Sequence, residues 1–213
     1  MYHRAMDGAH DVAAFILAGG KSTRMGKDKA FVNFEGRTLL ARALDLARSV
    51  ASGVWIVGSK EKFAAIAPVV EDIFRECGPL GGIHAALRAS PAELNVMLAV
   101  DTPFVSVDLL KYLITQARGR PDAAAIVPCA GGGLQPLSAI YRREFADAAE
   151  DALRSGQNRI NRLFDAVRTR VIGQEELEGA GFSPAIFRNL NTPEEMAAVR
   201  QEGRTATALK SES

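Results

Sequence analysis

A stretch rich in glycine and cations follows the first apolar run of this 213-residue chain. Residues 12–18 are apolar, and residues 19–29 then read GGKSTRMGKDK. Glycines let the backbone approach a ligand and turn its N–H groups inward, and lysine and arginine neutralise phosphate charge. The spacing fits neither a P-loop nor a Gly-x-Gly-x-x-Gly dinucleotide fingerprint. The stretch therefore indicates either an anion site or an ordinary glycine-rich turn with solvated lysines.

A carboxylate stands at the end of another apolar run. Residues 94–100 read LNVMLAV, and Asp101 follows them directly. Mg²⁺ is commonly bound by one or two carboxylates together with phosphate oxygens and water. Asp101 would suit that role if its strand ends beside the glycine-rich stretch, or it caps the turn or helix that follows. Asp72, which closely follows the apolar pair at 69–70, is open to the same two interpretations.

These side chains need elements that bring them together. Short apolar runs alternate with helical patterns along the chain. The apolar runs are residues 12–18, 54–57, 69–70, 94–100 and 123–127, and the helical patterns include residues 39–50, 82–90 and 107–118. Residues 75–82 are expected to form a loop. Continuous rather than alternating apolar strands are typical of a mostly parallel sheet covered on both faces. We therefore expect a three-layer α/β/α, Rossmann-like fold with one antiparallel element within residues 128–172. In such sheets ligands bind at the carboxyl ends of the strands.

Composition narrows the function classes. Lys and Arg number 26 against 25 for Asp and Glu, so the chain lacks the basic excess of a general nucleic-acid or membrane-surface binder. Two cysteines make neither a disulfide framework nor a zinc site. No apolar run is long enough to span a bilayer, and the N-terminus lacks a secretory core. We expect a cytoplasmic protein with one domain at residues 12–202 and disordered tails at 1–11 and 203–213.

Five motifs in order resemble those of a known family. LAGGKSTRMGKDKA, GPLGG, VDTPF, QPLSAIY and NLNTPEE are similar to the motifs of the molybdenum cofactor guanylyltransferases, the MobA family of the GT-A-like nucleotidyltransferase superfamily. The first motif is shared across the superfamily, whereas GKDK, GPLGG and DTPF together are more specific to this branch. The resemblance implies transfer of GMP from GTP to molybdenum-loaded molybdopterin, with Mg²⁺ as cofactor. It also implies transient contacts with molybdenum-insertion proteins and with the apoenzymes that receive the product.

The resemblance also assigns roles to matching residues. Nucleotide contacts are implied for Leu17, Ala18, Gly19, Gly20, Lys29, Gly58, Asp72, Gly82 and Asp101. Catalytic roles are implied for Arg24 and Lys29 at the phosphates and for Asp101 as the ligand of Mg²⁺. Pterin contacts are implied for Asn189, Asn191 and Arg159. Some members have Asn where this chain has Gly58, so a backbone contact or Ser59 would have to replace that side chain.

Two other functions stay open at this point. A cytidylyltransferase acting on the same pterin, or another nucleotidyltransferase of the superfamily, would use the same glycine-rich stretch with a different base pocket. A nucleotide-binding module without turnover would be expected to lack the metal carboxylate or the lysine, whereas Asp101 and Lys29 are both present.

Overall fold

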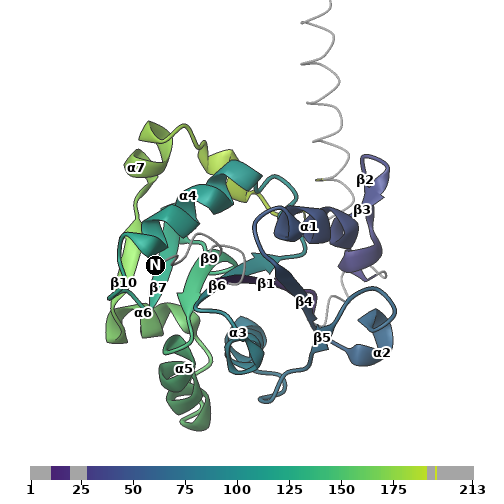
Figure 1. Ribbon diagram of the computed structural model, residues 1–213, viewed down its shortest axis with the longest axis horizontal. Helices are drawn as coiled ribbons and strands as arrows, with labels where there is room; N and C mark the ends of the chain where they lie inside the picture. The colour runs from purple at the N-terminus through teal and green to yellow at the C-terminus, as the bar shows by residue number, and fades with distance from the viewer. Residues whose placement is uncertain (1–10, 20–27, 191–194, 196–213) are drawn as a thin grey trace, which may run out of the picture.

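The sheet that organises the chain has eight strands among the residues that the computed structural model describes, which are 11–19, 28–190 and 195. Its order is β10-β7-β9-β6-β1-β4-β5, with β8 paired to β7 (Figure 1). The strands are β1 (Val12–Leu17), β4 (Gly53–Val57), β5 (Val69–Val70), β6 (Leu94–Ala99), β7 (Ala125–Ala130), β8 (Gly133–Leu134), β9 (Ser138–Arg142) and β10 (Thr169–Ile172). Strand β9 runs antiparallel to both of its neighbours, β6 and β7, whereas β1, β4, β5 and β6 are mutually parallel.

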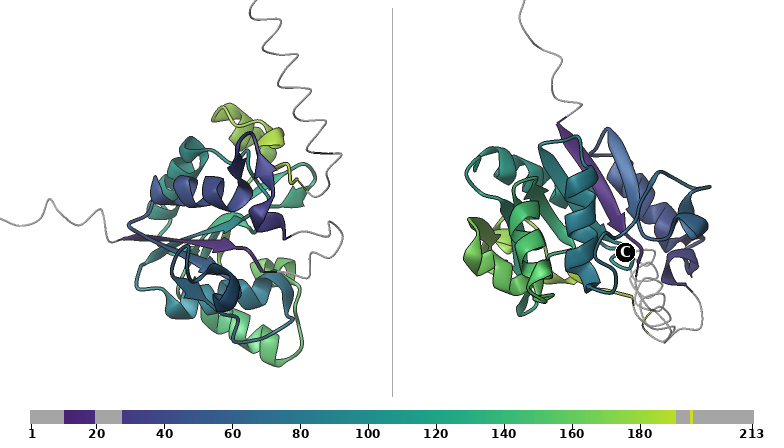
Figure 2. Two further views of the ribbon diagram at one scale, coloured as in Figure 1. Left: turned by 90° about the vertical axis from the view of Figure 1, so that its right-hand side faces the viewer. Right: turned by 90° about the horizontal axis from the view of Figure 1, so that it is seen from below.

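Helices cover both faces of this sheet. The α-helices are α1 (Leu39–Arg48), α2 (Lys60–Phe63), α3 (Gly78–Ala89), α4 (Val107–Arg118), α5 (Phe145–Arg154), α6 (Leu163–Ala166) and α7 (Gln174–Gly179). Short 3₁₀ turns are η2 (Lys29–Phe31), η3 (Ile160–Arg162) and η4 (Pro184–Phe187), and a small hairpin pairs β2 (Asn33–Phe34) with β3 (Arg37–Thr38). Helices α1 and α4 lie on one face, and α3 and α5 lie on the other (Figures 1 and 2).

Each face of β1 belongs to a separate core. Ala14 and Ile16 pack in the cluster that contains residues of α1 and α4. Ala13 and Phe15 pack in the cluster that contains residues of α3 and α5. Successive side chains of a strand point to opposite faces, so a strand buried on both faces must be apolar throughout. The expected three-layer α/β/α architecture with a mostly parallel sheet is confirmed.

The central strands end level with one another. Leu17 at the end of β1 pairs with Val57 of β4 on one side and with Ala99 of β6 on the other. Because β9 runs in the opposite direction, its first residue, Ser138, pairs with Leu98 near the same edge. The segments that follow β1, β4 and β6 therefore meet the segment that precedes β9.

The segment GPLGG differs from the expected loop. Helix α3 begins at Gly78, so these residues form its first turns rather than a loop up to residue 82. Pro79 is compatible with the first turn because its missing N–H has no partner there in any helix. The expected tails lie outside the described residues, apart from Asp11. Among the described residues, no helix is both long and apolar enough to cross a membrane.

Candidate active site

A cavity of about 780 Å³ opens at the edge where β1, β4 and β6 end. Residues expected at the nucleotide lie far apart in the sequence, yet many of them meet here. Those that line the cavity are Leu17, Ala18, Gly19, Lys29, Asp72, Gly82 and Asp101. Gly20 and Arg24 lie outside the described residues, so their expected roles stay predictions.

The end of β1 leaves the sheet at this cavity. Ala18 N–H donates to the Val57 carbonyl over 3.0 Å, and Val100 N–H donates to the Leu17 carbonyl over 3.2 Å. Gly19 is exposed and makes no hydrogen bond within the described part of the chain. Gly19 is thus the first residue along β1 and the segment after it whose backbone is available to a ligand.

Lys29 and Asp101, which both line the cavity, form an ion pair. The Lys29 Nζ lies 2.9 Å from Asp101 Oδ2, and the two side chains are 21% and 19% exposed. The backbone of Lys29 is held in η2, where the Asp28 carboxylate accepts the Ala30 N–H over 3.2 Å. The second Asp28 oxygen pairs with Lys62 Nζ at 2.9 Å. A cation and a carboxylate from segments 72 residues apart are therefore fixed at one point.

Helix α3 forms another wall of the cavity. A Cβ atom at Gly82 would lie 3.2 Å from Leu17 Cδ2 and 3.6 Å from Asp72 Oδ1, so glycine allows α3 to pack closely against β1. Burial raises the pKa of the Asp72 carboxyl group above its usual value. Asp72 is thus a partly buried carboxylate that lines the cavity beside the glycines of α3.

Gly58 has a different environment from the one expected. Neither Gly58 nor Ser59 is among the residues that line the cavity. The Gly58 N–H already donates to the Val70 carbonyl over 3.0 Å. A Cβ atom at this position would lie 3.0 Å from the Phe63 ring, so a larger residue does not fit without a shift. A nucleotide contact at Gly58 stays a prediction that this geometry does not support.

Several lining residues were not singled out from the sequence. Asp28, Glu76 and Leu137 line the cavity as well. Asp28 and Leu137 sit inside two of the quoted motifs, which is the signal that could have identified them. Glu76 has a backbone φ of 62°, a left-handed conformation that is uncommon outside glycine. The sequence alone does not predict this left-handed turn.

The expected pterin residues do not meet in one place. Leu190 N–H donates to the Asp101 carbonyl over 2.9 Å, so the neighbouring Asn189, which is exposed, lies close to the tip of β6. Asn191 lies outside the described residues. Arg159 instead lines a separate open groove of about 410 Å³, together with Arg162 and the turn after α5.

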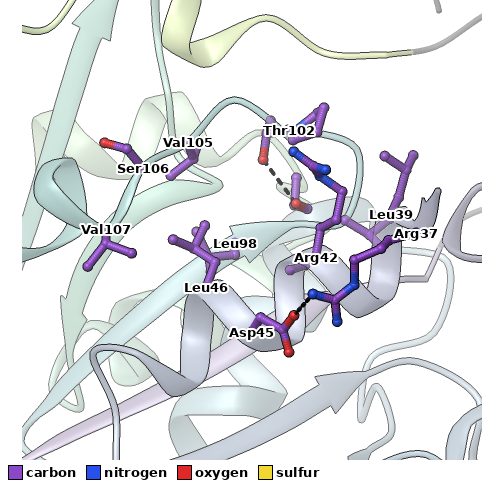
Figure 3. A pocket seen from close by; sticks show the side chains of 14 residues that line it. Arg37, Leu39, Arg42, Asp45, Leu46, Leu98, Thr102, Val105, Ser106 and Val107 are labelled. Atoms are coloured by element: carbon purple, nitrogen blue, oxygen red, sulfur yellow. Dashed lines mark hydrogen bonds and ion pairs between the residues drawn. The ribbon is translucent and has the colours of Figure 1, made fainter. Parts of the chain in front are cut away.

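A second cavity, which we call the rear cavity, lies on the α1 face of the sheet. It measures about 360 Å³ and is lined by residues of α1, the end of β6 and the segment up to Val107 (Figure 3). Its two arginines are already paired: Arg37 with Asp45, and Arg42 with Glu35 over 3.3 Å. The residues that line the rear cavity include neither the strand-end carboxylate Asp101 nor a glycine.

Comparison with known proteins agrees with this geometry. The model of the MobA-like NTP transferase domain matches residues 14–171, which is more than half of the chain. The chain belongs to the MobA-like NTP transferase family. The matched region contains every residue that lines the first cavity.

Relatives cover almost the whole chain. A molybdenum cofactor guanylyltransferase of Syntrophotalea carbinolica is 32% identical over 90% of this chain and 91% of its own length. A protein of the same name from Desulfosudis oleivorans is 33% identical over 87% of this chain and 92% of its own length. The solved structure of molybdopterin-guanine dinucleotide biosynthesis protein A from Archaeoglobus fulgidus superimposes with a TM-score of 0.77 at 26% identity, covering 91% of this chain and 99% of that one.

A more distant structure shares the fold alone. The 2-C-methyl-D-erythritol 4-phosphate cytidylyltransferase of Thermus thermophilus has a TM-score of 0.67 at 19% identity, covering 91% of this chain and 99% of its own. A nucleotidyltransferase for another base thus uses the same architecture, and base choice must come from local residues.

Proposed function

We propose that the protein transfers GMP from GTP to the terminal phosphate of molybdopterin that already carries molybdenum, with release of pyrophosphate. One observation carries the proposal. Lys29, Asp101 and the glycine at the end of β1 line one cavity in a chain whose relatives, 32% and 33% identical, are named for guanylyl transfer in molybdenum cofactor synthesis.

The reaction brings two polyanions together. A phosphate oxygen of the pterin attacks the α-phosphorus of GTP, and the bond from that phosphorus to the oxygen bridging to the β-phosphate breaks. Pyrophosphate leaves with the electron pair of that bond. Because the attacking oxygen is already an anion, no protein nucleophile is needed. Lys29, and Arg24 in the preceding stretch, would offset the repulsion, so that catalysis rests on positioning and electrostatics.

Asp72 is the residue we propose to select guanine. Guanine presents two donors side by side, N1–H and the N2 amino group, which a single carboxylate can accept. Cytosine and adenine each present one amino donor beside a ring acceptor, which would face a second carboxylate oxygen. Asp72 lines the cavity, and no hydrogen bond or ion pair joins its side chain to the rest of the described chain. Its acceptors are therefore open to a base.

Asp101 is the residue we propose to hold Mg²⁺. Within the described ranges, no group of three or more His, Cys, Asp or Glu side chains could hold a metal by itself. Mg²⁺ in nucleotide enzymes is commonly held by one or two carboxylates and completed by the phosphates of the substrate. Asp101, partly exposed and lining the cavity, suits that arrangement. Bound there, Mg²⁺ would supply positive charge to the phosphates.

The pterin would approach from the side of Asn189. The backbone bond from Leu190 to Asp101 holds this segment beside the carboxylate that we assign to the metal. Asn191 follows directly in the sequence, and Arg159 would act only if the pterin extends to its separate groove. We further propose that the reaction takes place in the cytoplasm, with transient handover from molybdenum-insertion proteins and to apoenzymes.

A pyrophosphate-release assay tests the proposal. GTP, CTP, ATP and UTP are each supplied with Mg²⁺, with and without molybdenum-loaded molybdopterin. We expect release only when GTP and the pterin are both present. A preference for CTP would instead make the protein a cytidylyltransferase. Nucleotide binding without release from any of the four would make it a binding module, and either result would overturn the proposal.

A further inference from the structure

We propose that Lys29 occupies the place of the divalent cation on Asp101 in the nucleotide-free protein, so that the metal enters together with the nucleotide rather than ahead of it. This inference deepens the proposed function and rests on it for the part played by the nucleotide. It concerns the order in which the cavity acquires its cations.

The starting point is the contact of the Asp101 carboxylate. Its Oδ2 lies 2.9 Å from Lys29 Nζ, and both side chains are about four-fifths buried, with 19% and 21% exposed. A partly buried carboxylate is stabilised by a nearby counter-charge. Lys29 supplies it without any metal.

The charges around the cavity make Lys29 the natural counter-ion. Asp28, Asp72, Glu76 and Asp101 line the cavity, and Lys29 is the one lysine or arginine among the described residues that does so. Asp28 is occupied by Lys62. Carboxylates thus outnumber cations among the described lining residues, and the cation that holds Asp101 is Lys29.

An ammonium and a divalent cation compete for this carboxylate. Two positive charges a few ångströms apart in partly hydrated surroundings repel one another strongly. A nucleoside triphosphate changes the balance, because its phosphates offer Lys29 a larger negative charge. Lysine is a compact charge on a flexible stem. The backbone of Lys29 is fixed by the Asp28 cap and the buried Ala30, so rotation of the side chain is enough to release Asp101 to the metal.

Binding of Mn²⁺ to the nucleotide-free protein tests this exchange. Free Mn²⁺ is measured by electron paramagnetic resonance while it is titrated into wild type, Lys29→Met and Lys29→Arg. We expect Lys29→Met to bind Mn²⁺ at least about tenfold more tightly than wild type, because one nearby positive charge is gone. Lys29→Arg keeps the charge and should stay as weak as wild type. Equal or weaker binding by Lys29→Met would overturn the proposal.

Two controls make the result specific. Lys62→Met removes a lysine that pairs at the same 2.9 Å with Asp28, a different lining carboxylate, and it should raise Mn²⁺ affinity far less than Lys29→Met does, because Asp28 is not the proposed ligand. Adding Asp101→Asn to Lys29→Met should remove the gain in Mn²⁺ affinity. If Lys29→Met does not fold, Lys29→Gln, which keeps a donor without the charge, gives the same comparison. The titration contains neither nucleotide nor pterin, so a failed guanylyl assay and a failed exchange are separate outcomes.

Discussion

Replacing Asp72 by asparagine tests the proposed reading of guanine. The change keeps the size of the side chain but leaves one acceptor oxygen and places an amino group where the other oxygen was. Asp72 Oδ1 and Oδ2 lie 3.6 and 3.9 Å from the Cβ positions built at Gly82 and Gly81, so the carboxylate rests against α3. Asparagine should therefore fit without disturbing the helix, and the effect should fall on the ligand.

The size of the effect follows from the hydrogen bonds lost. A hydrogen bond to a charged group contributes about 1.5–3 kcal/mol. Losing one such bond and setting two donors against each other should weaken GTP binding by about 2–3 kcal/mol, or roughly 30- to 150-fold. Inosine triphosphate lacks the N2 amino group, so wild type should bind it about tenfold more weakly than GTP. The variant should bind the two nucleotides almost equally.

Calorimetric titration of both nucleotides in Mg²⁺ provides the measurement. Glu76→Gln, at another carboxylate that lines the cavity, should keep the wild-type preference for GTP over inosine triphosphate. Since burial raises the pKa of Asp72, wild type should lose GTP affinity as the pH falls through that raised value, whereas Asp72→Asn should not. Equal weakening of both nucleotides in Asp72→Asn would refute the assignment of Asp72 to the N2 amino group of guanine.

Three further outcomes follow from the geometry. Asp101→Ala should lower turnover at least about a hundredfold, which corresponds to a loss of about 3 kcal/mol of transition-state stabilisation. The melting temperature should stay near that of wild type. Near-normal turnover would contradict the assignment of Asp101 to the metal. Gly81→Ala should destabilise the fold by about 1–3 kcal/mol in thermal unfolding, because its Cβ would lie 2.7 Å from the Phe74 carbonyl oxygen, which is backbone and cannot simply rotate away. Hydrogen bonds from Arg154, Arg88 and His84 lower the pKa of Glu150 from 4.5 to about 2. The contribution of Glu150 to folding stability is therefore complete above pH 4.5 and is lost as the pH falls towards 2. The difference in melting temperature between wild type and Glu150→Gln should shrink over that range, and a constant difference would argue against these contacts.

The central sheet could be predicted because its strands are buried on both faces. A parallel strand between two helical layers is mainly apolar, and β1 and β6 are such runs apart from the buried Asn95, whose amide donates to the Tyr141 carbonyl. Helix α4 matches its expected bounds, since Ser106 caps its first turn by accepting the Leu109 N–H. Here local sequence and tertiary environment favour the same structure.

Elements whose cause is tertiary could not be predicted. The paired glycines in GPLGG suggest a loop, yet they lie inside α3. Tertiary packing requires glycine there, because a Cβ at Gly81 would clash with backbone and one at Gly82 would press on Leu17. Helix α7 and the turn η4 are short and carry little apolar periodicity. Their packing against the rest of the chain, through residues such as Leu177 and Phe187, decides them.

The candidate site was predictable where it depends on strand ends. Asp101 and Gly19 follow apolar runs, and topology brings such positions to one edge. The pairing of Lys29 with Asp101 was not predictable, because it depends on the path of the chain through η2. The placement of Gly58 away from the lining was likewise beyond the sequence, since it reflects the position of the Phe63 ring.

Gly58 and Phe63 also restrict how this sequence can evolve. The Cβ atom of an asparagine at position 58 would lie 3.0 Å from the Phe63 ring. A smaller residue at position 63 would first leave a hole in the core, where Phe63 is only 1% exposed, at a cost of about 3–5 kcal/mol for alanine. A residue with a Cβ atom at position 58 therefore requires the Phe63 ring to shift, and a smaller ring or aliphatic side chain at position 63 would provide that space. Asparagine at position 58 is therefore expected to be tolerated best together with a smaller residue at position 63.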